Sequence, residues 1–281
     1  MLKAGDFVLC WAVFRQLPFA TFLGVARDAG FRGITIGLGA YYRAREDGLT
    51  DGDIRALVED HDLKIEYVDG LLSWIPGAPE VPGTMVPGIR AETDVAKYFE
   101  VAAAIGAPMV NAVTVLDFDP GIDAVASAFS SLCEKAYPLR MSLEFTPFGA
   151  VPDLKAAQNI IDLVAKKNAG IMLDTWHFGR SNSQLSDIEA IAPERYFAIQ
   201  VSDTGETRHH DLFEETLHYR LLPGRGAAKV AKTLEALWKH GVRLPYDAEI
   251  FSDELLAKPP LEAALQMVAA MISVVPPTDR R

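Results

Sequence analysis

Four polar side chains stand at the ends of apolar segments in the second half of the chain. Glu144 ends MSLE, Asp174 ends GIMLD, Gln200 lies in FAIQVSD and Glu249 ends YDAE. A single carboxylate at such a position often caps the following helix. Glu144 and Glu249 have apolar residues on both sides, where an unpaired charge is costly unless it binds a cation or takes up a proton. We therefore predict that the four side chains meet around one metal ion.

The predicted ligands supply oxygen atoms only. Three carboxylates in one place repel each other, and a divalent cation removes that repulsion. Two glutamates, one aspartate and an amide oxygen favour Mn²⁺ or Mg²⁺ over a thiolate zinc site. A histidine among the ligands would shift the preference toward Co²⁺, Fe²⁺ or Zn²⁺.

The elements that must position these residues alternate along the chain. Segments with apolar residues at helical spacing, such as 93–107, 123–137 and 153–168, separate β-rich segments. The expected strands cover residues 7–13, 33–38, 64–69, 108–115, 139–145, 170–176, 196–203 and 245–251. Eight such alternations in about 250 residues predict a (β/α)8 TIM barrel, whose strands present catalytic groups at their C-terminal ends. A doubly wound open sheet is the alternative.

The barrel is expected to be one domain over residues 1–281, with a frayed tail from about residue 275. Long connections at 73–88 and 202–226 are expected to lie over the open end of the barrel. Asp203 and Asp253 are the carboxylates for which a pure helix-capping role is expected.

Composition excludes several classes of partner. The formal net charge of −11, without a lysine or arginine cluster, argues against a nucleic acid. The N-terminal segment resembles neither a signal peptide nor a membrane span, so we expect a soluble, cytoplasmic protein without a membrane partner. Cys10 and Cys133 lie in apolar surroundings and are expected to be reduced thiols.

The second half of the chain resembles the xylose isomerase-like TIM barrel superfamily, particularly its sugar phosphate isomerase and epimerase members. The resemblance is carried by the segments LEFTPFGAVPDL, LDTWHFGRS, IQVSD, RLLPGRG and EIFSDEL. It implies a single divalent metal ion held by Glu144, Asp174, Gln200 and Glu249. It also implies a homo-oligomer, because related barrels are often dimers or tetramers.

Gln200 departs from the epimerase branch, most of whose members have histidine at this position. Glutamine there, together with DLFEETLHYRLLPGRG and EIFSDE, is similar to the bacterial 3-dehydroshikimate dehydratases of the same superfamily. The endonuclease IV branch uses a histidine-rich cluster of three zinc ions. We exclude it because this chain lacks enough suitably placed histidines and is acidic.

Two further residues are expected to contact the substrate. The resemblance implies a substrate-binding or acid/base role for His177, three residues after Asp174; the alternative is a ring packed beside Trp176. Arg220 follows the seventh strand, where a guanidinium can hold a carboxylate, a phosphate or a sugar hydroxyl. Its alternative is an arginine on the surface.

The walls of the pocket are expected to come from residues near the other strand ends. His218 shares the connection 202–226, and Trp11, Tyr67 and Trp74 lie at or after strand ends in the first half. Aromatic residues in such positions also serve as core residues.

These residues predict a metal-dependent isomerase or epimerase of a small sugar or polyhydroxylated ketone. Glu144 and Glu249 would remove and return a proton next to a metal-bound carbonyl through an enediolate, with His177 as a further acid/base. Return of the proton to a departing hydroxyl would instead give a dehydratase of the 3-dehydroshikimate type. A non-catalytic ligand-binding barrel is the third hypothesis.

Overall fold

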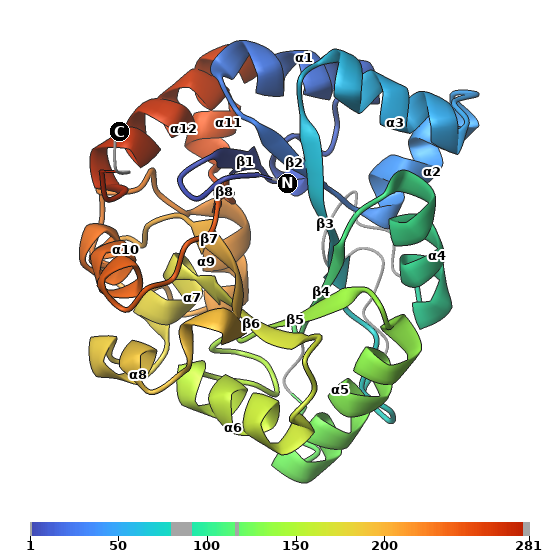
Figure 1. The fold of residues 1–281 in the computed structure, drawn as a ribbon. Helices are drawn as coiled ribbons and strands as arrows, with labels where there is room; N and C mark the ends of the chain where they lie inside the picture. Colours follow the sequence, from blue (N-terminus) through green and yellow to red (C-terminus); the bar gives the residue numbers. More distant parts are fainter. Residues whose placement is uncertain (1, 80–91, 116–117, 278–281) are drawn as a thin grey trace.

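Eight parallel strands close into a barrel, with helices around the outside (Figure 1). The computed structural model describes residues 2–79, 92–115 and 118–277. Each strand pairs with its neighbours in chain order, and β1 pairs with β8 to close the ring. The predicted (β/α)8 barrel is confirmed, because an open sheet would leave two strands with a single neighbour.

Every predicted β segment overlaps one strand, although β3 and β6 extend beyond the predicted bounds. The strands are β1 (Phe7–Leu9), β2 (Gly33–Ile36), β3 (Lys64–Leu71), β4 (Met109–Val113), β5 (Arg140–Glu144), β6 (Ala169–Asp174), β7 (Tyr196–Val201) and β8 (Tyr246–Ala248).

In two of the predicted strand segments, two or more of the last residues form a helix instead. Residues Trp11–Phe14 form the short helix η1, whose first backbone N–H donates to Thr35 Oγ1 at 3.0 Å. Residues Thr175–Arg180 form α7, because the Asp174 carboxylate accepts the backbone N–H of Trp176 at 2.7 Å and so starts a helix.

The remaining helices form a layer around the barrel. They are α1 (Phe19–Ala29), α2 (Leu38–Glu46), α3 (Asp51–Asp60), α4 (Val95–Ile105), α5 (Ile122–Ala136), α6 (Leu154–Val164), α8 (Leu185–Glu189), η2 (Pro193–Arg195), α9 (Leu212–His218), α10 (Val230–Lys239), α11 (Asp253–Leu256) and α12 (Pro260–Val274). Among the residues that the structure describes, no helix combines the length and the apolar character needed to cross a membrane.

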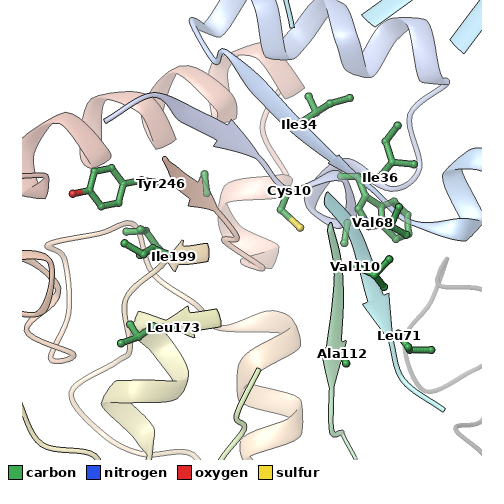
Figure 2. Packing of buried hydrophobic residues seen from close by; sticks show 14 of the residues in the cluster. Cys10, Ile34, Ile36, Val68, Leu71, Val110, Ala112, Leu173, Ile199 and Tyr246 are labelled. Atoms are coloured by element: carbon green, nitrogen blue, oxygen red, sulfur yellow. The ribbon is translucent and has the colours of Figure 1, made fainter. Parts of the chain in front are cut away.

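Side chains along the strands alternate between the helix layer and the barrel interior. Leu173, Ile199 and Tyr246 belong to the large apolar core between strands and helices (Figure 2). Each residue that directly follows such a residue faces the interior, which is how Asp174 and Gln200 come to point inward. They are paired across β6 and β7 in the strand register, so they lie at the same level of the barrel.

The long connection after β7 is tied back onto the barrel. The Asp203 carboxylate accepts backbone N–H groups of Gly224, Gly226 and Ala228 at 2.9–3.0 Å. A Cβ on Gly226 would lie 1.9 Å from the Thr204 carbonyl oxygen, so glycine is needed for this close approach. Asp203 therefore fixes the return path of the chain between α9 and α10, and its predicted role as a helix cap is wrong.

Three further predictions concern Asp253, the connection 73–88 and the C-terminal tail. Asp253 is the first residue of α11 rather than its cap, because Ser252 takes the capping position. Of the predicted connection 73–88, residues 80–88 lie outside the described residues. The helix α12 ends at Val274, and residues 278–281 of the expected tail lie outside the described part.

Candidate active site at the open end of the barrel

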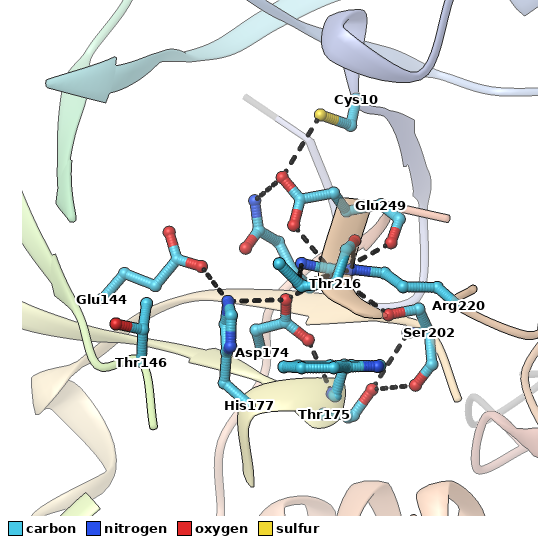
Figure 3. A network of polar contacts seen from close by, with 12 residues as sticks. Cys10, Glu144, Thr146, Asp174, Thr175, His177, Ser202, Thr216, Arg220 and Glu249 are labelled. Carbon is cyan, nitrogen blue, oxygen red and sulfur yellow. Dashed lines mark hydrogen bonds and ion pairs between the residues drawn. The ribbon is translucent and has the colours of Figure 1, made fainter. Parts of the chain in front are cut away.

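The four predicted metal ligands all reach the same end of the barrel. Glu144 and Asp174 are the last residues of β5 and β6, Gln200 lies in β7, and Glu249 follows β8 directly. All four are buried, with at most 6% of any residue exposed. In Figure 3 the carboxyl groups of Glu144, Asp174 and Glu249 surround His177 and Arg220. Ionisable groups are thus concentrated where water is largely excluded.

His177 lies closer to the carboxylates than the sequence alone indicated. Its Nε2 atom is 3.2 Å from Glu144 Oε1 and 3.6 Å from Asp174 Oδ2. One ligand atom from each of these three residues lies within 4.8 Å of the others. The reason is local: α7 begins at Asp174, and one helical turn brings the residue three positions later back over its carboxylate.

Arg220 is buried inside the site rather than exposed on the surface. Its Nη1 atom lies 2.7 Å from Asp174 Oδ2 and 3.0 Å from Glu249 Oε2. Its Nε atom donates to the Thr216 carbonyl at 2.9 Å, and Nη2 donates to Thr216 Oγ1 at 2.8 Å. The guanidinium therefore joins two predicted ligands, and most of its donors are used within the protein.

Glu249 also belongs to a second group of close ionisable side chains. One ligand atom each from Cys10, Asp69 and Glu249 lies within 4.8 Å of the others. Cys10 Sγ is 3.6 Å from Glu249 Oε1. Cys10 and Cys133 are both free thiols and both buried, as expected from the sequence.

Asp69 and Asn111 are site residues that our sequence analysis missed. The Asn111 Nδ2 group donates to Asp69 Oδ1 at 2.9 Å and to Glu144 Oε2 at 2.6 Å. Asp69 ends the predicted strand 64–69, so it carried the same strand-end signal as the four predicted ligands.

Burial and neighbouring charges separate the pKa values of these groups. Burial raises the pKa of Glu144 and of Glu249 well above its usual value, and the surrounding carboxylates add to the effect. Burial also raises the pKa of Asp69 to about 6 and lowers that of His177 to about 3. Without a metal ion, burial therefore favours the protonated form of Glu144 and Glu249, and His177 is neutral at pH 7.

Asp174 behaves differently from the other carboxyl groups. Burial by itself would raise its pKa, but the Arg220 guanidinium, His177 and the Trp176 N–H together hold its pKa below the usual value. Asp174 is thus the carboxylate that stays ionised, which suits a metal ligand better than a proton donor.

The cavity beside these groups is small and has two different walls. Its volume is ≈ 80 Å³, and Asp69, Glu144, His177, Arg220 and Glu249 form the polar wall. The apolar part of the lining includes Leu72, Val113, Val115, Phe148, Phe213, Leu217 and Phe251. The Phe148 ring packs edge-on against His177, with ring centres 5.7 Å apart. A larger cavity of ≈ 290 Å³ between η1, α1 and α2 contains none of the predicted metal ligands.

Three residues that were predicted to line the substrate pocket do not line this cavity, namely His218, Trp74 and Tyr67. His218 Nδ1 is 3.1 Å from Asp253 Oδ2 and does not line the cavity. Trp74 donates its indole N–H to the Val113 carbonyl at 3.1 Å and packs against Phe129 in the core. An indole ring with its N–H satisfied fits the apolar layer outside the strands, which was the alternative for this residue.

Parts of this chain are similar in sequence to known enzymes. The inosose isomerase of Halalkalibacterium halodurans is 26% identical over 174 residues, which is 60% of this chain and 60% of that protein. A 3-dehydroshikimate dehydratase of Pseudomonas aeruginosa is 27% identical over 122 residues, covering 43% of this chain and 19% of the dehydratase. The chain thus spans less than two thirds of the length of these relatives.

Similarity to solved structures and to a family extends over nearly the whole chain. The crystal structure of the IolI protein with a bound zinc atom has a TM-score of 0.83 and 19% identity, covering 96% of this chain and 98% of that one. The sequence model of one family matches residues 23–273. This range includes every strand except β1. It also includes Asp69, Glu144, Asp174, His177 and Glu249, but not Cys10. On this match the protein belongs to the xylose isomerase-like TIM barrel family.

Proposed function

We propose that the protein is a divalent-metal-dependent isomerase or epimerase of a small polyhydroxylated ketone. The observation that carries the proposal is the buried cluster at the barrel mouth, in which Glu144, Asp174 and His177 offer ligand atoms within 4.8 Å of one another. Relatives with the name inosose isomerase, such as that of H. halodurans, support this type of reaction.

The side chains present fit a divalent cation. Gln200 Oε1 and His177 Nδ1 are buried polar atoms without a hydrogen-bond partner. We propose Glu144, Asp174, Gln200 and Glu249 as the ligands, with His177 close enough to contribute its Nε2. The oxygen donors favour Mn²⁺ or Mg²⁺, whereas an imidazole donor favours Co²⁺, Fe²⁺ or Zn²⁺. When bound, the cation supplies fixed positive charge that stabilises negative charge developing on substrate oxygens.

The chain's own residues then divide the proton transfers. Glu249 and Glu144 project from β8 and β5, three strands apart, so they can act on the substrate from different sides. One removes the proton next to the carbonyl and the other returns a proton to the neighbouring atom or to the opposite face. His177 is neutral at pH 7, because burial lowers its pKa to about 3. A neutral imidazole has one free lone pair, which can either bind the metal ion or accept a hydrogen bond from a substrate hydroxyl.

The cavity also selects the kind of substrate. Among its described lining residues, Arg220 is the only arginine or lysine, and its Nη1 is already bound to Asp174 and Glu249. The described lining residues thus offer no uncommitted cation for a phosphate or carboxylate. Its apolar wall suits the C–H face of a compact carbon skeleton. An uncharged ketose or inosose fits these walls better than a sugar phosphate.

A dehydratase of the 3-dehydroshikimate type is the second candidate. It is supported by the P. aeruginosa relative of that name and by glutamine at position 200. The commitment of Arg220 to two carboxylates counts against it, because 3-dehydroshikimate carries a carboxylate that needs a partner. A homo-oligomer and a cytoplasmic location remain predictions from the sequence.

Proton exchange in heavy water tests the proposal without knowledge of the product. Protein loaded with Mn²⁺ is incubated with a panel of ketoses and inososes in D₂O, and deuterium at the carbon next to the carbonyl is followed by NMR. We expect exchange with at least one uncharged substrate. An aromatic ultraviolet band from 3-dehydroshikimate would support the dehydratase instead. Failure of the metal-free protein to take up Mn²⁺, Mg²⁺, Co²⁺ or Zn²⁺ would support a non-catalytic barrel.

A further inference from the structure

A chain of buried hydrogen bonds lies inside the barrel next to the carboxylate cluster. It joins Asp247 of β8, Tyr67 of β3 and Gln200 of β7, none of which is more than 2% exposed. The Tyr67 hydroxyl donates to Asp247 Oδ2. The Gln200 Nε2 group donates to the Tyr67 oxygen at 3.3 Å and to Glu249 Oε1 at 3.1 Å. Gln200 and Asp247 are paired in the register of β7 and β8, so the Tyr67 hydroxyl can reach both of their side chains.

The donor and acceptor roles along this chain have one consistent direction. A phenol has a single hydrogen, and Tyr67 gives it to Asp247. A carboxyl group keeps an acceptor oxygen whether or not it is protonated, so Asp247 can play this part in either state. The Tyr67 oxygen must then accept its second hydrogen bond, and the amide nitrogen of Gln200 is the group that can donate it.

This direction determines which way the Gln200 side chain is turned. Both hydrogens of Nε2 are used, one toward Tyr67 and one toward Glu249. Oε1 lies on the other branch of the planar amide and has no hydrogen-bond partner, although it is fully buried. A buried amide oxygen without a partner is costly, unless it faces a ligand.

We infer that Tyr67 and Asp247 form a positioning pair that holds the Gln200 amide with its oxygen free for the metal ion. The inference rests on the proposed metal site and assigns it two supporting residues. An amide oxygen is a good ligand for a hard cation. The amide NH₂ group is only a hydrogen-bond donor and cannot bind a cation. A flipped Gln200 would therefore remove one ligand and place N–H groups near the cation.

The surroundings of the pair argue against a role in packing alone. Tyr67 belongs to a small apolar cluster with Met109, Met172 and Phe197, and Asp247 lies beside it inside the barrel. A carboxyl group in this position costs free energy that an apolar residue of similar volume would not. The pair is therefore better explained by what it does to Gln200 than by a contribution to stability.

Metal affinity measured by isothermal titration calorimetry with Mn²⁺ tests the inference. Tyr67→Phe removes the acceptor for Nε2 and frees the amide to turn. We expect a loss of Mn²⁺ affinity of roughly 10- to 100-fold, typical of residues that orient metal ligands. Tyr196→Phe is the matched control, because it removes another buried hydroxyl, which donates to the Ile188 carbonyl at 3.0 Å away from the site. We expect the control to bind Mn²⁺ like the unmodified protein.

A double-mutant cycle distinguishes positioning through Gln200 from a general structural effect. In a Gln200→Ala background, the added Tyr67→Phe change should cause no further loss of affinity. An equal loss in both backgrounds, or unchanged affinity of Tyr67→Phe, would overturn the inference while leaving the metal site in place. An unmodified protein that binds no Mn²⁺ would overturn the proposed function and the inference together. If Tyr67→Phe shows no cooperative thermal unfolding, Asp247→Ala replaces it with the same expected loss, because it frees the Tyr67 hydroxyl to donate to Gln200 Oε1.

Discussion

The Arg220 Nη1 atom lies 2.7 Å from Asp174 Oδ2 inside a site where both residues are at most 2% exposed. This contact keeps Asp174 ionised in surroundings that push other carboxyl groups toward the neutral form. It also means that the protein supplies one positive charge of its own to the predicted metal site. The remaining carboxyl groups stay available for a divalent cation and for proton transfer.

Arg220→Met should strongly destabilise the metal-free protein. Removing the guanidinium leaves a buried Asp174 without its counter-charge, which typically costs about 3–5 kcal/mol. Urea unfolding of EDTA-treated protein measures the difference. The control Arg45→Gln breaks an ion pair with Asp51 whose side chains are 41% and 37% exposed, and it should cost less than about 1 kcal/mol. Similar losses for the two variants would contradict a special role for Arg220.

Glu249→Gln should abolish most proton exchange while the barrel stays folded. The amide keeps the shape of the side chain but cannot remove a proton, so we expect a rate loss of about 10²–10⁴-fold. Deuterium incorporation measures the rate, and circular dichroism checks the fold. Glu254→Gln, an exposed residue of α11, is the matched control and should leave the rate unchanged. Exchange that survives Glu249→Gln would refute this assignment of the base.

Asp69 should make the metal-free protein less stable as the pH rises. Burial raises its pKa from 3.8 to about 6, so the folded state binds the proton more tightly than the unfolded state. The stabilising contribution of this proton to the free energy of unfolding is fully present below pH 3.8 and is lost between about pH 4 and 6. Asp69→Asn removes this loss, and should stabilise the protein by up to about 3 kcal/mol at pH 7.

The comparison across pH is the decisive part of the Asp69 measurement. Urea unfolding of Asp69→Asn and unmodified protein should give similar free energies at pH 3.5 and different ones at pH 7. The control Asp60→Asn replaces an exposed carboxyl group at the end of α3 and should change the free energy of unfolding by less than about 0.5 kcal/mol. A stabilisation by Asp69→Asn that is the same at both pH values would refute the proposed burial effect.

Mn²⁺ should stabilise the protein through His177 but not through His218. A ligand at 100 times its dissociation constant adds about 2.7 kcal/mol, which corresponds to a rise in melting temperature of roughly 5–10 °C for a chain of this size. His177→Ala removes a donor beside Glu144 and Asp174 and should reduce the rise. His218→Ala should keep it, because His218 binds Asp253 outside the cavity. Differential scanning fluorimetry with and without Mn²⁺ measures both, and an equal rise in all three proteins would exclude His177 from the site.

Local sequence patterns determined where the eight strands lie along the chain and which of their side chains face the barrel interior. Period-two alternation places a residue such as Asp174 inside the barrel because Leu173 before it must pack against helices. Asp153 stands just ahead of an apolar helical segment, and its carboxylate accepts the backbone N–H of Ala156 at the start of α6. These features depend on neighbours a few residues away, which a single sequence displays.

Only the tertiary structure decided which polar groups meet. Arg220 reaches Asp174 because Asp203 ties the long connection after β7 back onto the barrel, and no local pattern encodes that path. Asn111 joins Asp69 to Glu144 across three strands, and Trp74 lies in the core although its position also fitted a pocket wall. Contacts between residues far apart in the chain depend on strand register and loop closure together, so the sequence supplied the candidates and the closed barrel selected among them.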